Sequence, residues 1–205
     1  MNINPNIFDK KSRATSRIAH DEVSASNKLA IEVKQMLPAD IRNRPTVLVC
    51  IGTDRSTGDS LGPLVGTLLK EKSLSKLYVY GTLEDPIHAV NLAEKLDSIK
   101  KLHNNPFIIG VDACLGRVKS VGVIQIANGP VKPGAGVNKD LPEVGDMHIA
   151  GIVNVSGFME FMVLQNTRLS LVMKMAKTIA NGIHEVTLMN HANWAAIDWS
   201  KEQTL

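Results

Sequence analysis

Two aspartates are the side chains of this sequence best placed to do chemistry. Asp59 lies in the glycine-rich segment IGTDRSTGDSLGP (51–63), and Asp112 lies in the segment VDACLG (111–116). Two neighbouring carboxyl groups can form an acid–base pair, because one can hold a proton while the other accepts one. Each aspartate also has a structural interpretation: Asp59 as the N-cap of the next helix, and Asp112 as a turn residue that bonds its own backbone.

A few other side chains are candidates for the same site. His148 begins an apolar run beside a glycine-rich loop, where it is either a hydrogen-bonded structural residue or a ligand. Cys114 and His148 would make a thiol nucleophile and its base, but nothing in their spacing favours that arrangement. The chain has no CxxC, HExxH, GxGxxG or GxxxxGK[ST] pattern. We therefore expect neither a dedicated metal site nor a cofactor.

The segments that must position these residues alternate between strand and helix patterns. Short apolar or β-branched runs predict strands over 46–51, 77–80, 107–111, 121–126 and 147–155, with a further edge strand over 185–188. Periodic apolar positions predict helices over 21–37, 60–72 and 85–102, and one or two more between 155 and 180. We expect the helix over 85–102 to begin with Asp85 as N-cap and Pro86 in its first turn.

The order of these elements predicts an α/β fold of three layers, α/β/α, of the phosphorylase/hydrolase type. Its sheet should be mostly parallel, with about five to six strands and an antiparallel one. If the first three strands lie in the order 2-1-3, a crevice opens at the carboxyl ends of strands one and three, where Asp59 and Asp112 follow. Only nine residues separate the strands at 107–111 and 121–126, so we expect these two to pair antiparallel. The loop 130–144 should form a mobile wall of the crevice.

Charge divides the chain into a short arm and a body. Residues 1–20 carry four Lys or Arg and one Asp, a net charge of +3 that equals the net charge of the whole chain. Residues 21–205 hold the remaining 19 positive and 19 negative side chains, which gives no sign of a basic face for nucleic acid. We interpret 1–20 as a flexible basic arm and 21–205 as a single α/β domain.

Hydropathy and cysteine content indicate a cytoplasmic protein. No apolar run reaches the roughly 18 residues of a membrane span. The N-terminus has no continuous apolar core of the kind that a secretory signal needs. Cys50 and Cys114 are the two cysteines, and we expect both to be reduced thiols.

Three linked segments resemble a known group of proteins. The segments IGTDRSTGDSLGP, VDACLG and IQIANGPVKPGAGVNK (124–139) are similar to stretches of the bacterial spore germination protease. That family cleaves small acid-soluble spore proteins and shares its fold with hydrogenase maturation peptidases. The chain most resembles the smaller YyaC-type family of sporulation proteins, and the resemblance covers about 46–180, including NVSGFMEFMVLQNTRLSLVMKMAK.

The resemblance implies roles for individual residues. Asp59, in its D-x-L-G-P element, and Asp112, in its strand-ending D-A element, match the two acidic residues of the germination protease. Asn154 matches the slot of a metal-contacting histidine in the H-x-x-G element of hydrogenase maturation peptidases, so nickel recognition does not carry over. The candidate substrate-binding residues are Gly52, Thr53, Gly58, Gly134, Gly136, Asn138, His148 and Asn154.

We therefore predict a sporulation-associated peptidase or hydrolase in which Asp59 and Asp112 activate water. At about 4 Å, their mutual repulsion would be roughly 4 kcal/mol, enough to bring one carboxyl to titrate near neutrality. At about 7 Å, the pKa shift would be under about two units, so both would stay ionised at pH 7 and the pair would need acid conditions or a metal. Two other interpretations stay open: a non-enzymatic peptide- or ligand-binding protein on the same fold, and a metal-assisted hydrolase with Asp59, Asp112 and His148 as ligands. The expected partner is a protein or peptide, such as small acid-soluble spore proteins in the forespore or spore core. A homo-oligomer also stays open.

Overall fold

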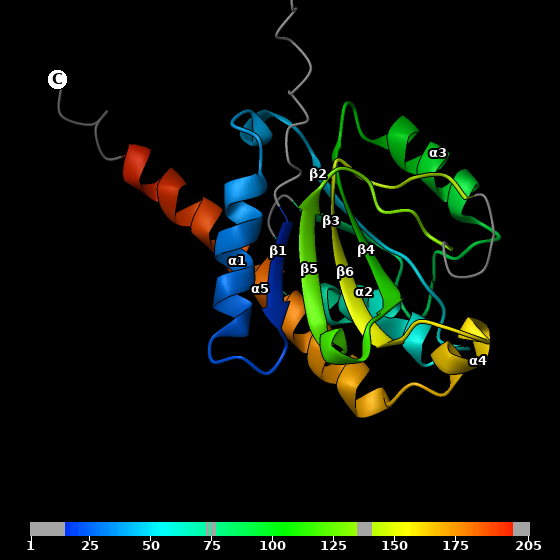
Figure 1. The fold of residues 1–205 in the computed structure, drawn as a ribbon. Coiled ribbons are helices and arrows are strands. Elements are labelled where there is room, and N and C mark those ends of the chain that lie inside the picture. The colour runs from blue at the N-terminus through cyan, green and yellow to red at the C-terminus, as the bar shows by residue number, and fades with distance from the viewer. Residues whose placement is uncertain (1–14, 73, 75–76, 135–140, 199–205) are drawn as a thin grey trace, which may run out of the picture.

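A six-stranded sheet organises the part of the chain that the structure, a computed structural model, describes: residues 15–72, 74, 77–134 and 141–198 (Figure 1). The strands are β1 (Thr15–Ala19), β2 (Thr46–Cys50), β3 (Leu77–Tyr80), β4 (Phe107–Gly116), β5 (Val123–Asn128) and β6 (Met147–Val155). The helices are α1 (Ala25–Met36), α2 (Leu61–Lys70), α3 (Leu92–Leu102), α4 (Glu160–Gln165) and α5 (Leu169–Asp198). Three short 3₁₀ turns are η1 (Ile41–Asn43), η2 (Gly58–Ser60) and η3 (Val118–Ser120).

The strands lie in the order β1-β5-β6-β4-β2-β3. β3, β2, β4 and β6 pair in parallel, whereas β5 is antiparallel to both β6 and β1. The predicted 2-1-3 order is confirmed, because β2 lies between β3 and β4. A crossover through α2 joins β2 to β3, and a crossover through α3 joins β3 to β4. The chain therefore changes direction between β2 and β4, which is the switch point of the fold.

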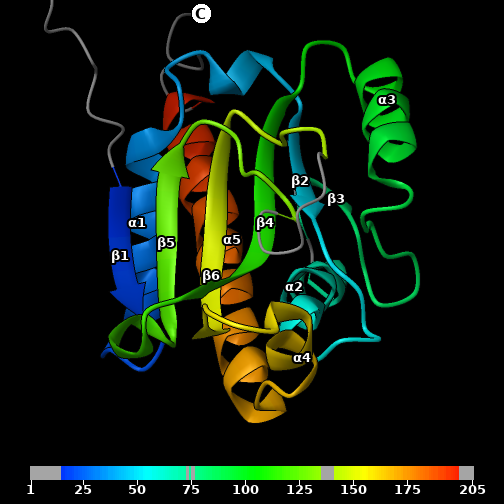
Figure 2. The ribbon, with the colours of Figure 1, turned by 45° about the vertical axis from the view of Figure 1, so that its right-hand side comes forward.

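Helices cover the two faces of the sheet unequally. α1, α2 and α5 lie on one face, where the main core forms around Leu48, Val111 and Ile149. α3 lies on the other face and closes a smaller core around Val49 and Ile108. Figure 2 shows α1 and α5 behind β5 and β6 and α3 to one side, with none of the described helices over the opposite face of those two strands. The predicted three-layer α/β/α architecture is confirmed.

Three expectations about individual elements were wrong. Residues 15–19 of the predicted arm form the edge strand β1, which pairs with β5 from Thr15–Ala127 to Ala19–Val123; residues 1–14 lie outside the described residues. β4 does not pair with β5, because β6 lies between them. Residues 185–188 belong to α5 rather than to a strand, because the helical spacing of buried apolar side chains continues to Ile183 and Val186.

The predicted cap of the third helix was also wrong. α3 begins at Leu92 with Asn91 as its N-cap, six residues later than the expected start with Asp85 as N-cap. Asn91 Oδ1 accepts a hydrogen bond from the His88 N–H at 2.8 Å and so shapes the turn before the helix. The Asp85 carboxylate instead accepts hydrogen bonds from Lys95 Nζ at 2.9 and 3.0 Å.

None of the described helices combines the length and apolar character that crossing a bilayer requires.

Candidate active site

Asp112 lies in β4 at the point where the neighbouring strand leaves the sheet. β2 pairs with β4 only as far as Cys50–Val111, whereas β6 accompanies β4 to Gly116. β4 is thus longer than the predicted 107–111, and Asp112 is inside it. No strand pairs with Ala113 on the β2 side of β4. The Ala113 N–H instead donates a hydrogen bond to Asp112 Oδ1 at 2.8 Å. Asp112 does bond its own backbone, as the structural interpretation expected, but in a strand and not in a turn.

Two glycines bring Asp59 close to the end of β2. The Thr53 N–H donates a hydrogen bond to the main-chain oxygen of Asp59 at 3.2 Å. Gly52 has φ of +142°, and a Cβ there would lie 1.9 Å from that same oxygen. A Cβ on Gly62 would lie 2.1 Å from the Ile51 carbonyl oxygen. The loop can therefore fold back on β2 only with glycine at these positions.

The Asp59 side chain is not used as a helix cap. α2 begins at Leu61, its N-cap is Ser60, and no side chain caps it by a hydrogen bond. Asp59 instead lies within η2, and its side chain is only partly accessible. The N-cap interpretation was therefore wrong.

Burial raises the pKa of both carboxyl groups, and the charge of Asp59 acts on Asp112. The pKa of Asp112 rises to about 8, mainly through burial; the bond from the Ala113 N–H opposes the rise and the charge of Asp59 adds to it. Burial also raises the pKa of Asp59. From the sequence we considered the mutual repulsion of the two carboxylates alone; in the structure burial contributes more to the rise than the charge of Asp59 does. Part of the Asp112 side chain still meets solvent, so its proton can exchange with water.

Ser56 is the neutral neighbour of Asp59. Its hydroxyl lowers the pKa of the Asp59 carboxyl and partly offsets the effect of burial. Ser56 Oγ is buried, and among the described residues it has no hydrogen-bond partner of ordinary geometry. The hydroxyl therefore lies near the Asp59 carboxyl but outside ordinary hydrogen-bond geometry, and it has hydrogen-bonding capacity to spare.

Asn154 positions the site rather than entering it. Its Nδ2 donates hydrogen bonds to Val163 O and to Thr167 Oγ1, both at 3.2 Å, and its Oδ1 accepts one from the Val155 N–H at 2.9 Å. Thr167 in turn lies against Gly58, where a Cβ would be 3.1 Å from Thr167 Oγ1 and 2.7 Å from Leu164 Cδ2. Asn154 therefore holds α4 against the turn that carries Asp59, and its polar atoms already have partners.

The remaining predicted binding residues fall in different places. His148 lies on β6 opposite Gly110 of β4, and its Nδ1 donates a hydrogen bond to Gly129 O at 2.7 Å. Thr53 Oγ1 accepts hydrogen bonds from Arg55, at 3.3 Å from its N and 3.4 Å from its Nε. Gly134 has φ of +72° in the loop after β5. Gly136 and Asn138 lie outside the described residues.

The loop 130–144 is anchored at both ends. Val131 and Val144 exchange backbone hydrogen bonds at 2.9 and 3.0 Å, and Lys132 Nζ lies 2.8 Å from Glu143 Oε1. Val144 is buried in the smaller core. A Cβ on Gly110 would lie 2.8 Å from Val131 Cγ1, so these ends pack directly on β4. The described ends of the loop are therefore packed on β4; residues 135–140 lie outside the described residues, and the mobile wall stays a prediction.

The structure does not support two of the chemical alternatives. Within the described part of the chain, no three His, Cys, Asp or Glu side chains gather in a way that could hold a metal ion. Asp59, Asp112 and His148 therefore do not make a three-ligand set. Burial raises the pKa of the Cys114 thiol to about 12, so the thiol is protonated at neutral pH and is a poor nucleophile.

One feature near the site was not predicted from the sequence. Four large apolar side chains are exposed there: Phe158 by 90%, Met159 by 55%, Phe161 by 57% and Met162 by 47%. They lie on α4 or just before it, and α4 packs against η2, which carries Asp59. The run GFMEFM was visible in the sequence, but its solvent exposure was not. We call these four residues the α4 apolar patch.

The fold is that of a known class of proteins. The structure resembles the crystal structure of a [NiFe] hydrogenase maturation protease, HycI, from Thermococcus kodakarensis KOD1, with a TM-score of 0.52 and 17% sequence identity. The match covers 77% of this chain and 99% of that one. The chain therefore has a hydrogenase maturation protease-like fold.

Residues 17–182 match the family described as "Protein of unknown function (DUF1256)", and the chain belongs to that family. It is also 55% identical over 197 residues to the uncharacterized protein YyaC of Bacillus subtilis (strain 168), covering 95% of this chain and 93% of that protein. The predicted resemblance to YyaC-type proteins and to the hydrogenase maturation peptidase fold is confirmed.

Proposed function

We propose that this chain is a peptidase-like hydrolase in which Asp59 and Asp112 act together on a peptide bond. The observation that carries the proposal is the pair itself, two interacting carboxyl groups at the switch point of a parallel sheet. At pH 7 Asp112 keeps its proton, because its pKa is about 8. Asp59 is then the carboxyl group available to accept a proton, which separates the two roles that acid–base catalysis requires.

The reaction that we propose is direct attack by water. The Asp59 carboxylate takes a proton from a water molecule as the water oxygen bonds to the carbonyl carbon. Asp112 donates a hydrogen bond to the carbonyl oxygen and then gives its proton to the leaving nitrogen as the C–N bond breaks. The proton that Asp59 gained from water passes to Asp112, which restores the pair.

Two features support a protein or peptide substrate. β4 continues beyond the end of β2, so its edge from 112 to 116 has no paired strand on that side. An extended peptide can bind such an edge through its own backbone. The α4 apolar patch lies beside the turn that carries Asp59, and apolar surface of this kind often marks a protein-binding site.

We further propose that the substrate is a protein of a spore-forming bacterium, such as a small acid-soluble spore protein in the forespore. The support is the motif resemblance to the spore germination protease, together with the similarity to the Bacillus subtilis protein. The fold likeness supports a protease because the similar structure is that of a protease.

Kinetics of three variants test the proposal. The wild type, Asp59→Asn, Asp112→Asn and the double variant should be incubated with purified small acid-soluble spore proteins, and cleavage followed by mass spectrometry. If both carboxyls serve one step, each single change should cost nearly as much rate as the double change. Asp97→Asn, on the exposed side of α3, is the matched control and should cleave normally. Full activity in both single variants would remove the paired-aspartate mechanism.

A further inference from the structure

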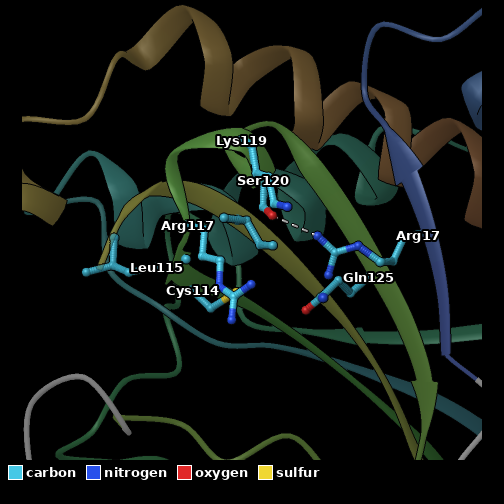
Figure 3. A pocket seen from close by; sticks show the side chains of 9 residues that line it. Arg17, Cys114, Leu115, Arg117, Lys119, Ser120 and Gln125 are labelled. Carbon is cyan, nitrogen blue, oxygen red and sulfur yellow. Dashed lines mark hydrogen bonds between the residues drawn. The ribbon is translucent and has the colours of Figure 1, made fainter. Parts of the chain in front are cut away.

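A hollow of about 420 Å³ lies on the sheet face that α1 and α5 do not cover. Residues from β1, β4, β5, β6 and the turn η3 line it. Figure 3 shows Arg17 and Arg117 entering it from different elements, with Gln125 and Cys114 at its floor. Arg17 comes from β1, the strand that the sequence alone did not predict, and Arg117 follows the end of β4.

The hollow is positively charged and contains no acid. Three of its lining residues are cations, Arg17, Arg117 and Lys119, and none is Asp or Glu. Among the described residues, none of the three cations forms an ion pair. Like charges that converge on one hollow without a counter-charge favour an anionic ligand.

Arg17 is held in place by neutral partners. Its Nη2 donates a hydrogen bond to Ser120 Oγ at 3.0 Å, and Ser120 is buried, with 9% exposure. Arg17 also lies directly opposite Gln125 in the antiparallel pairing of β1 with β5. These contacts orient the guanidinium but leave most of its donors and all of its charge free for a ligand.

The hollow adjoins the aspartate pair. Cys114 lines it and lies two residues beyond Asp112 on β4, so both side chains point to the same face of the sheet. At about 3.3 Å of rise per residue, the two positions are about 7 Å apart. The charges of Asp112 and of Arg17 both act on the Cys114 thiol. A peptide bound at Asp112 can therefore reach the hollow within a few residues.

We propose that this hollow is a subsite for a carboxylate of the peptide substrate, either an acidic side chain a few residues from the cleaved bond or the terminal carboxylate. The inference rests on the proposed function, since it names the class of substrate for that site. A guanidinium pairs well with a carboxylate through two parallel hydrogen bonds, and the Gln125 amide can bond the peptide backbone. Nucleic acid is disfavoured, because residues 21–205 carry 19 charges of each sign and Arg17 adds one cation only.

Binding should be measured on the Asp59→Asn, Asp112→Asn double variant, so that cleavage does not interfere. The probes are acetyl-Ala-Ala-Glu-Ala-Ala-amide, the same peptide with Gln in place of Glu, and acetyl-Ala₅ with a free carboxylate. We expect the Glu peptide or the free-carboxylate peptide to bind roughly tenfold more tightly than the Gln peptide, as one charge-assisted pair would give. The stronger of these two probes identifies which carboxylate the subsite takes.

Arg117→Gln and Lys119→Gln, both at exposed positions, should remove most of that preference. Arg17→Gln should do the same, and a thermal melt shows whether it still folds. Arg42→Gln, an exposed arginine of η1, is the control and should bind as the parent does. Equal affinity for Glu and Gln peptides, or an unchanged preference in Arg117→Gln, would overturn the subsite. Displacement of the acidic peptide by inorganic phosphate or oligothymidylate at lower concentration would overturn its assignment to carboxylates.

The two proposals fail separately. If the wild type cleaves no spore protein but charge-dependent binding is found, the subsite stands and the hydrolase mechanism falls, leaving a peptide-binding protein. If cleavage depends on Asp59 and Asp112 but Glu and Gln peptides bind equally, the mechanism stands and the subsite falls.

Discussion

Asn154 donates a hydrogen bond from its Nδ2 to Thr167 Oγ1 at 3.2 Å, which joins the end of β6 to the start of the segment before α5. Thr167 is buried and touches Gly58, the residue before Asp59. Support for Asp59 therefore comes from a residue far away in the sequence. Asn154 occupies the slot where we placed a metal-contacting histidine in related peptidases, but here it has a structural task.

Changing Asn154 to Asp should destabilise the fold by about 1–3 kcal/mol, because the change replaces a donor by an oxygen facing Val163 O. Asn166→Asp is the matched control, since Asn166 Nδ2 also bonds a carbonyl, Met162 O at 2.8 Å, but at an exposed position. It should cost less than about 0.5 kcal/mol. Urea unfolding of both variants measures the difference, and equal losses would contradict the role of Asn154.

Gly58→Ala should destabilise the fold and displace the turn that carries Asp59. The new Cβ would lie 2.7 Å from Leu164 Cδ2 and 3.0 Å from Leu164 O, so η2 and Asp59 must shift or α4 must move. We expect a loss of stability of about 1–3 kcal/mol. Adding Leu164→Ala makes room for the methyl group. The double variant should then be less destabilised than the sum of the two single changes, whereas strict additivity in thermal melts would argue against this contact.

The contribution of Asp112 to the stability of the fold should fall as pH rises from about 4 to about 8. The pKa of Asp112 is about 8 in the folded chain and near its ordinary value when unfolded. Between these values the unfolded chain releases a proton that the folded chain keeps, so unfolding becomes more favourable with rising pH. Because Asp112 is partly accessible, we expect a gain of about 1–3 kcal/mol for Asp112→Asn at pH 8. The gain should shrink toward pH 4, and a constant gain would contradict the raised pKa.

The rate of cleavage should have a bell-shaped dependence on pH. On the alkaline side it should fall near pH 8, where Asp112 loses the proton that it donates. On the acidic side it should fall when Asp59 becomes protonated, above the usual range of an aspartate because burial raises its pKa. Rates measured with a peptide identified in the cleavage experiment would show both limbs. A profile that stays flat through pH 9 would exclude Asp112 as the acid.

The Cys114 thiol should react slowly with alkylating reagents, although Cys114 lines the hollow. The pKa of its thiol rises to about 12, mainly through burial; the charge of Asp112 adds to the rise and that of Arg17 opposes it. Iodoacetamide at pH 7.5 should therefore label the native protein slowly, as intact-mass measurements would show. Unfolded protein in urea is the control and should label quickly at both cysteines. Cys114→Ser should retain activity, and a large loss would revive a thiol mechanism.

The local pattern of residues was sufficient for much of the parallel half of the fold. The runs at 46–51, 77–80 and 147–155 became β2, β3 and β6 with almost the expected bounds, because buried strands need short apolar runs whatever their partners are. The order of strands and helices then placed Asp59 and Asp112 at one switch point. Residue types and the connections between elements determine these features, and both are written along the chain.

Other features needed the tertiary structure, because they depend on partners far apart in the chain. Thr15–Ala19 looked like part of a charged arm, and it becomes a strand only because β5 offers an open edge more than a hundred residues later. That pairing brings Arg17 to Ser120 and completes the basic hollow. The raised pKa of Asp112 likewise comes mainly from burial. Residue types and connections along the chain therefore set which acids meet at the switch point, whereas packing sets how far water is excluded from them and which charges lie beside them.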